Sequence, residues 1–368
     1  MEISLYIIWL ICLGIQWIYL YRVFWPLAEY GSKNTDSDPK FNGDKSVSIL
    51  VIVKNELDNL RALIPLLLNQ DYTGNFDIYI IDDHSTDFTA DWFQQEHDWP
   101  PEKIKYYPST LSGSGKKQGL IYALSLPTHA LLLLTDADCR PVSDNWLDSM
   151  VNALGDQDDA VLGYSPYLKQ AGWLNGLIQL ETTYTALMYL GMALKGHPYM
   201  GVGRNILYKK SALSGSKSLF DFGHLISGDD DLTVNELSIH HKINIQFTPA
   251  SYMESIPKKN LQEWIRQKTR HISTSAYYRP VHKLFLGVYY SSLILTWIVP
   301  LSLIWINSWL LWSLIGFKFI FYSFLKPLVL KAFRQKWSFA DWFIAEGLYA
   351  GSLIWLGLTG FIKKPSKW

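Results

Sequence analysis

Short apolar runs alternate with amphipathic stretches between residues 46 and 164. Runs of four to eight residues rich in Val, Ile and Leu predict buried strands, and apolar residues spaced three and four apart predict helices. Strands are expected at 46–53, 77–81, 104–107, 130–135 and 160–164. Helices are expected at 59–69, 89–96, 118–126 and 146–154. Strands that alternate with helices indicate βαβ units and therefore an α/β fold with a mostly parallel sheet.

Both ends of the chain are apolar. Residues 3–21 contain no Asp, Glu, Lys or Arg, and about 20 such residues cross a hydrocarbon core. A signal peptide is the alternative, but it would have a basic region before the apolar run, where only Met1 and Glu2 stand. Three more membrane helices are expected at 284–306, 309–325 and 341–362. The basic tail after the last segment fits a full crossing poorly, so a re-entrant or interfacial segment is left open.

Composition adds few restrictions. Lys plus Arg and Asp plus Glu number 33 each in 368 residues, so charge gives no reason to expect a nucleic acid partner, and we expect none. The two cysteines, Cys12 and Cys139, give no disulfide framework and suit a reducing compartment. Residues 171–195 carry Glu181 as their single acidic or basic side chain before Lys195. That helix packs in a core or lies along a membrane interface.

Two carboxylates follow the most apolar predicted strand. Asp136 and Asp138 come directly after Leu131 to Thr135, and the carboxyl ends of strands are where open α/β sheets bind ligands. Because two neighbouring carboxylates repel each other, a divalent cation that is bound to a phosphate-bearing substrate would neutralise them. The sequence therefore predicts a metal and nucleotide site at this edge.

Further polar residues follow the other strands. Lys54 and Glu56 end the first strand, and Asp82 and Asp83 end the second. Acidic groups there can accept hydrogen bonds from a base or a ribose, although a solvated turn that caps the next helix is an alternative. Lys116 and Lys117 close a glycine-rich loop that can approach a diphosphate but lacks the spacing of a P-loop.

Two clusters lie further along the chain. Asp229, Asp230 and Asp231 are adjacent, so they cannot all ionise cheaply in a cleft, and one of them can serve as a general base for an acceptor hydroxyl. An exposed helix start is the alternative. Gln267 and Arg270 belong to a basic stretch that can clamp a leaving diphosphate or meet lipid headgroups.

Taken in order, these motifs resemble the membrane-bound members of glycosyltransferase family 2, which include cellulose, chitin and hyaluronan synthases and ceramide glucosyltransferase. The resemblance implies that Asp83, with Asp82, binds the nucleotide and that Asp136 and Asp138 form the D-x-D motif. It makes Asp229 the catalytic base with Asp231 close by, and it places Gln267 and Arg270 in the Q-x-x-R-W motif. The sequence departs from the family at two positions, with Gly228 in place of Glu or Thr and His271 in place of Trp.

The resemblance also implies a GT-A fold and an inverting transfer from a nucleotide sugar, UDP-hexose, to a lipid or glycan acceptor, with Mg²⁺ or Mn²⁺ as cofactor. The nucleotide-sugar site would comprise Lys54, Glu56, Asp82, Asp83, Lys116, Lys117, Asp136, Gln267 and Arg270, with Asp229, Asp231 and Arg270 catalytic. The protein would be integral to the cytoplasmic membrane, with its catalytic domain in the cytoplasm. The expected parts are a membrane helix (1–25), a linker (26–45), the GT-A domain (46–275) and a membrane region (276–368).

Three alternatives remain open from the sequence. A processive polysaccharide synthase uses the same motifs, but His271 stands where those enzymes carry Trp. A catalytically inactive scaffold or nucleotide-sugar sensor is favoured by Gly228 and disfavoured by the intact Asp136 and Asp138. A nucleotidyltransferase also uses paired carboxylates and metal, but the basic motif before the membrane segments disfavours it.

Overall fold

The structure is a computed structural model that describes residues 2–33, 45–95, 99–110, 115–221, 228, 230–303, 308–333 and 338–362. Among these residues the chain forms two compact units. The sheet unit comprises 45–168 and the described part of 192–258. The helical unit comprises 2–33, 169–191 and the described part of 259–362. The domain boundaries expected from the sequence remain predictions.

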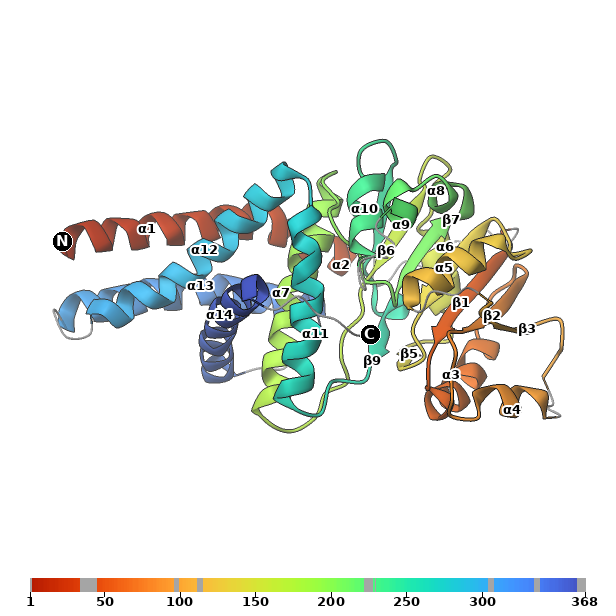
Figure 1. Cartoon of the computed structure of the whole chain (residues 1–368). Coiled ribbons are helices and arrows are strands. Elements are labelled where there is room, and N and C mark those ends of the chain that lie inside the picture. Colours follow the sequence, from red (N-terminus) through yellow and green to blue (C-terminus); the bar gives the residue numbers. More distant parts are fainter. Residues whose placement is uncertain are drawn as a thin grey trace. The chain divides into compact units, whose positions relative to one another are not determined.

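The sheet unit is built on seven strands in the order β3-β2-β1-β4-β7-β6-β8 (Figure 1). Strands β3, β2, β1 and β4 are parallel to one another, β7 is antiparallel to β4 and β6, and β8 is parallel to β6. The strands are β1 (Val47–Val53), β2 (Phe76–Asp82), β3 (Ile104–Pro108), β4 (Leu131–Thr135), β6 (Ala160–Gly163), β7 (Ile206–Lys209) and β8 (Ile243–Gln246). A separate antiparallel pair joins β5 (Cys139–Pro141) to β9 (Met253–Ser255). The expected mostly parallel sheet is confirmed.

Alternate residues of β1 face two different helical layers. Ile49 and Val51 belong to the same buried cluster as α3 (Leu57–Leu68) and α6 (Trp146–Asn152). Ile52 points the other way, because successive side chains of a strand lie on opposite faces. There it meets α5 (Lys116–Ser125), where a Cβ built on Gly119 would lie 2.6 Å from Ile52 Cγ2. Burial on both faces explains why β1, β2 and β4 are mostly apolar.

The four helices predicted between residues 59 and 154 are present as α3, α4 (Thr89–Gln94), α5 and α6, with ends that differ from the prediction by a few residues. Further short helices complete the sheet unit. They are α8 (Lys210–Ser214), α9 (Lys217–Asp221), α10 (Asp231–Leu237) and the 3₁₀ turn η2 (Pro249–Ser251). The α5 helix begins at Lys116, two residues earlier than its pattern predicts. Lys116 and Lys117 therefore lie in the first turn of a helix, and Gly115 before them has φ +126°, which favours glycine.

The helical unit contains the long apolar segments (Figure 1). Its elements are α1 (Glu2–Tyr19), the π-helical turn η1 (Leu20–Phe24), α2 (Trp25–Lys33), α7 (Trp173–Leu194, up to Gly191), α11 (Leu261–Thr274), η3 (Ser275–Tyr277), α12 (Pro280–Leu303), α13 (Ser308–Phe333) and α14 (Phe339–Ile362). Helix α2 occupies the first part of the segment expected to be a linker, because Leu27 and Ala28 are buried; residues 34–44 lie outside the described part. Within the described residues two stretches are long and apolar enough to cross a membrane, Ile3–Lys33 and Pro280–Ser302.

A lysine of α13 and a glutamate of α14 form a buried ion pair. Lys318 Nζ lies 2.9 Å from Glu346 Oε1, and both side chains are buried. Glu346 also accepts hydrogen bonds from Tyr184 of α7 at 2.5 Å and from Trp297 of α12 at 3.1 Å. A buried charge is tolerated only when it is paired and hydrogen-bonded. These contacts explain how two ionisable residues occupy segments that the sequence predicts to be apolar.

Candidate active site

The loops after β1 and β2 are tied to each other. Asn55 donates its backbone N–H to Ser85 Oγ at 2.9 Å, and its side-chain oxygen accepts from the backbone N–H of Thr86 at 2.7 Å. Asn55 and His84 have φ values of +56° and +61°, which are uncommon for residues other than glycine. Such backbone strain is typical of functional sites, where the surrounding structure holds it in place.

Asp82 and Asp83 end β2 in different surroundings. Asp83 is fully buried, accepts a hydrogen bond from the backbone N–H of Gly115 at 2.7 Å and lies 3.7 Å from Lys54 Nζ. Asp82 accepts from the backbone N–H of Ser85 at 2.8 Å and from the hydroxyl of Tyr106 at 2.5 Å. Burial and the bond to Asp82 raise the pKa of Tyr106. Asp82 thus holds the turn, and Asp83 joins three segments: β2, the β1 end and the start of α5.

The carboxylates after β4 lie beside a lysine and a third acid. Lys116 Nζ is 2.5 Å from Asp136 Oδ1. Burial raises the pKa of Asp138, and the charge of Asp136 raises it further, whereas Arg204 and Lys258 lower it. The pKa of Glu56 is raised by burial and, among smaller effects, by the charges of Asp138 and Asp136. The ends of β1 and β4 therefore place three carboxylates within electrostatic reach of one another.

Of the acidic cluster 229–231, the structure describes Asp230 and Asp231; Asp229 lies outside the described residues. Asp230 caps α10 by accepting from the backbone N–H of Asp231 at 2.8 Å, and it accepts from the backbone N–H of Gly203 at 2.8 Å. A methyl group built on Gly203 would lie 3.1 Å from Asp230 Oδ2 and 3.0 Å from Lys116 Nζ. The fold thus brings this cluster next to Lys116 and Asp136, although about ninety residues separate the two acidic motifs.

Arg204 is a buried cation near Asp136 and Asp138 that the sequence did not predict to be part of the site. Arg204 donates to Ser165 Oγ at 2.6 Å and to the Tyr167 hydroxyl at 3.1 Å, and its guanidinium lies 4.5 Å from the centre of the Tyr167 ring. An arginine in the glycine-bearing turn Gly201 to Asn205 was the available signal. Its charge lowers the pKa of Asp138 and so opposes the effect of Asp136, which raises that pKa.

The residues fit a divalent cation that is shared with a substrate. Among the described side chains, no three of the His, Cys, Asp and Glu type gather closely enough to hold a metal by themselves. Mg²⁺ is commonly held by one or two carboxylates together with substrate phosphates and water. Asp136 and Asp138, whose mutual repulsion a cation would relieve, supply that number of ligands.

Comparison with known proteins decides the family of the sheet unit. The family model described as Glycosyl transferase family 2 matches residues 48–215. Residues 48–215 form a glycosyltransferase family 2 domain. The match contains Asp83, Asp136 and Asp138 but ends before the acidic cluster and before α11. The expected family is confirmed for this segment, and the roles expected for all the site residues, inside and outside it, remain predictions.

Two solved structures resemble this glycosyltransferase to different degrees. The mannosyltransferase PcManGT from Pyrobaculum calidifontis, in complex with GDP-Man and Mn²⁺, is similar with a TM-score of 0.64 and 16% identity, over 98% of this chain and 99% of that chain. TarS 1-349 from S. aureus has a TM-score of 0.43 and 16% identity, over 67% of this chain and 71% of that chain. A search of curated proteins finds no match. The first likeness shows that the fold is of the GT-A type.

The remaining predicted site residues of the glycosyltransferase lie in the helical unit. Gln267 and Arg270 are three residues apart on α11, so they share one face of that helix. Lys268 between them pairs with Glu181 of α7 at 2.5 Å. The single acidic residue of α7 is therefore used to hold α11, and the roles expected for Gln267 and Arg270 remain predictions.

Proposed function

We propose that this glycosyltransferase transfers a sugar, with inversion, from a nucleotide-diphosphate sugar to a lipid, lipid-linked or polysaccharide acceptor at the cytoplasmic face of a membrane. The observation that carries the proposal is the gathering of Asp83, Lys54, Lys116, Asp136 and Asp138 at the carboxyl ends of neighbouring strands in a family 2 domain. That edge is where α/β sheets bind nucleotides.

The donor would lie across the ends of β1, β2 and β4. Asp83 would accept from the base, and Lys54 beside it would compensate its charge in the free protein. Lys116 and Lys117 stand in the first turn of α5, where the helix dipole and the lysine charges favour a diphosphate. UDP-hexose is our first choice of donor, and the GDP-Man in the similar structure makes GDP-mannose the second to test.

Asp136 and Asp138 would hold Mg²⁺ or Mn²⁺. The Mn²⁺ in the similar mannosyltransferase supports this choice. When bound, such a cation stabilises negative charge on a leaving phosphate. Asp229, with Asp231 one residue away, would remove the proton from the acceptor hydroxyl. Asp230 would support both by fixing the start of α10 and the Gly203 turn.

A membrane location is supported by the two long apolar stretches, Ile3–Lys33 and Pro280–Ser302. Exposed Ile, Leu, Phe and Trp side chains follow α1, α12, α13 and α14, which suits contact with lipid. We expect the glycosyltransferase domain to face the cytoplasm. Protease added outside sealed cells should then leave residues 31–45 intact, and cleavage there that requires no permeabilisation would contradict this orientation.

Transfer itself is tested by incubating membranes that contain the protein with labelled UDP-glucose, UDP-N-acetylglucosamine or GDP-mannose and Mn²⁺. We expect label to enter a product that extracts into organic solvent, because His271 stands where polymer-forming relatives carry Trp. Label in an insoluble polymer would favour the processive alternative. No transfer and no release of nucleotide with any donor would favour the inactive scaffold and contradict the proposed activity.

A further inference from the structure

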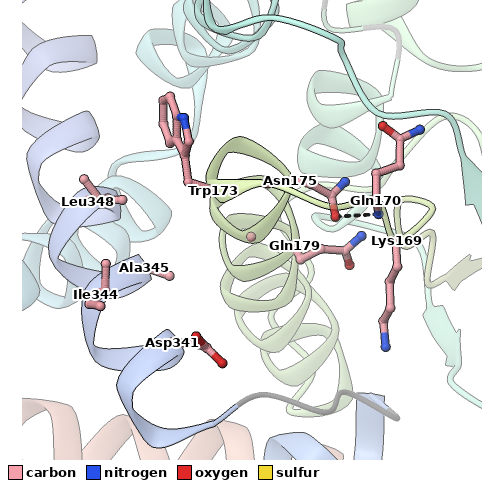
Figure 2. Close-up of a pocket in the computed structure, with 11 residues that line it drawn as sticks. Lys169, Gln170, Trp173, Asn175, Gln179, Asp341, Ile344, Ala345 and Leu348 are labelled. Atoms are coloured by element: carbon pink, nitrogen blue, oxygen red, sulfur yellow. Dashed lines mark hydrogen bonds between the residues drawn. The ribbon is translucent and has the colours of Figure 1, made fainter.

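A hollow lies within the helical unit, between the start of α7 and the start of α14, with a volume of about 390 Å³ (Figure 2). On α14 it is lined by Asp341, Ile344, Ala345 and Leu348. These positions are spaced as i, i+3, i+4 and i+7 and so form one face of the helix. The volume falls within the range of small-molecule binding sites.

Two glycines leave this hollow open. A Cβ built on Gly172 or Gly176 would have no atom within 4 Å. Gly176 lies inside α7, where glycine is less favourable than alanine by about 1 kcal/mol. No steric contact requires glycine at position 176. The absence of a side chain there leaves space in the hollow that a larger residue would fill.

Hydrogen bonds between the same two helices hold the walls of the hollow in place. The hydroxyl of Tyr184 on α7 donates to Glu346 Oε2 on α14 at 2.5 Å, and it accepts a hydrogen bond from Trp342 Nε1 on α14 at 3.4 Å. Because both partners are buried, these contacts fix the distance between the helices. The hollow is therefore formed before any ligand arrives.

The lining is apolar on one side and polar on the other. Trp173 and Ile344 are 60% and 61% exposed, and the exposed apolar surface continues along α14 to Trp355. The polar side carries Lys169 and the amides of Gln170, Asn175 and Gln179. Lys169 and Asp341 contribute one positive and one negative charge to the lining, and Asp341 accepts hydrogen bonds from Ser338 just before α14. Amides both donate and accept, as hydroxyl groups do.

We propose that this hollow binds one membrane lipid whose head is uncharged and rich in hydroxyl groups, as in a glycolipid. The exposed apolar face of α14 would contact the chains. The amides and the ring of Trp173 would contact the head, and the balanced charges give no advantage to an anionic head. The inference rests on the membrane location proposed above and names the kind of lipid that the protein recognises there.

The test fills the hollow from Gly176. Wild type, Gly176→Phe, Gly176→Ala and Gly287→Phe are placed in phosphatidylcholine nanodiscs that contain a photoreactive glucosyl-diacylglycerol or, in a second arm, photoreactive phosphatidylglycerol. Gly287 on α12 also has no atom within 4 Å of a built Cβ, so its Phe variant adds the same ring elsewhere. Labelled peptides are identified by mass spectrometry.

We expect the glycolipid probe to label 169–179 and 341–348 in wild type, Gly176→Ala and Gly287→Phe, and this labelling to fall to the unirradiated level in Gly176→Phe. Equal labelling of Gly176→Phe, or equal labelling of these peptides by phosphatidylglycerol, would overturn the inference and leave the membrane location intact. Failure of the wild type to enter nanodiscs would contradict the membrane location and the inference together.

Discussion

Asp138→Asn is expected to lower sugar transfer by about 10²–10³-fold and to abolish metal-dependent binding of the nucleotide sugar. The variant removes one of two carboxylates that a cation would bridge. It also removes a charge whose formation is opposed by burial and by Asp136, so the melting temperature should stay the same or rise. Calorimetric titration of the nucleotide sugar with and without Mn²⁺, together with thermal unfolding, measures both effects.

A matched control is Asp156→Asn, which removes an exposed carboxylate of the same sheet unit before β6. It should leave the nucleotide affinity and the transfer rate unchanged. If adding Mn²⁺ raises the affinity of Asp138→Asn for the nucleotide sugar as much as it raises that of the wild type, Asp138 does not belong to the site. If it loses binding because it no longer folds, the melting curve reveals this.

Asp229→Asn is expected to slow transfer by about 10²–10⁴-fold while nucleotide-sugar affinity is retained. The amide cannot take the proton of the acceptor hydroxyl, but it preserves the size of the side chain. The measurement is single-turnover transfer alongside equilibrium binding of the donor. Turnover at the wild-type rate in the purified variant would exclude Asp229 as the base.

Asp230→Asn separates a chemical role from a structural one. Both carboxylate oxygens of Asp230 accept backbone hydrogen bonds, from Asp231 and from Gly203, and an amide can accept only one of them. We expect a loss of about 1 kcal/mol in the free energy of unfolding and a smaller loss of transfer than in Asp229→Asn. A larger loss in Asp230→Asn would move the base to that position.

The sequence by itself determined the α/β class and most element positions. Strand β4 could be predicted from the sequence because four consecutive leucines fit a strand that is buried on both faces. The same local pattern placed Asp83, Asp136 and Asp138 at strand ends, and parallel strands bring their carboxyl ends to one edge. These inferences needed only periodicity and the direction of the strands.

Pairings between distant residues were decided by the tertiary structure. The sequence predicted Lys116 as a phosphate ligand but not as the partner of Asp136. It gave no indication that Arg204 is buried and bonded to Ser165. The contacts of Lys318 with Glu346 and of Glu181 with Lys268 likewise join side chains of different helices. A hydrogen bond or ion pair depends on the distance between two side chains in space, and local patterns of apolar and polar residues contain no information about that distance.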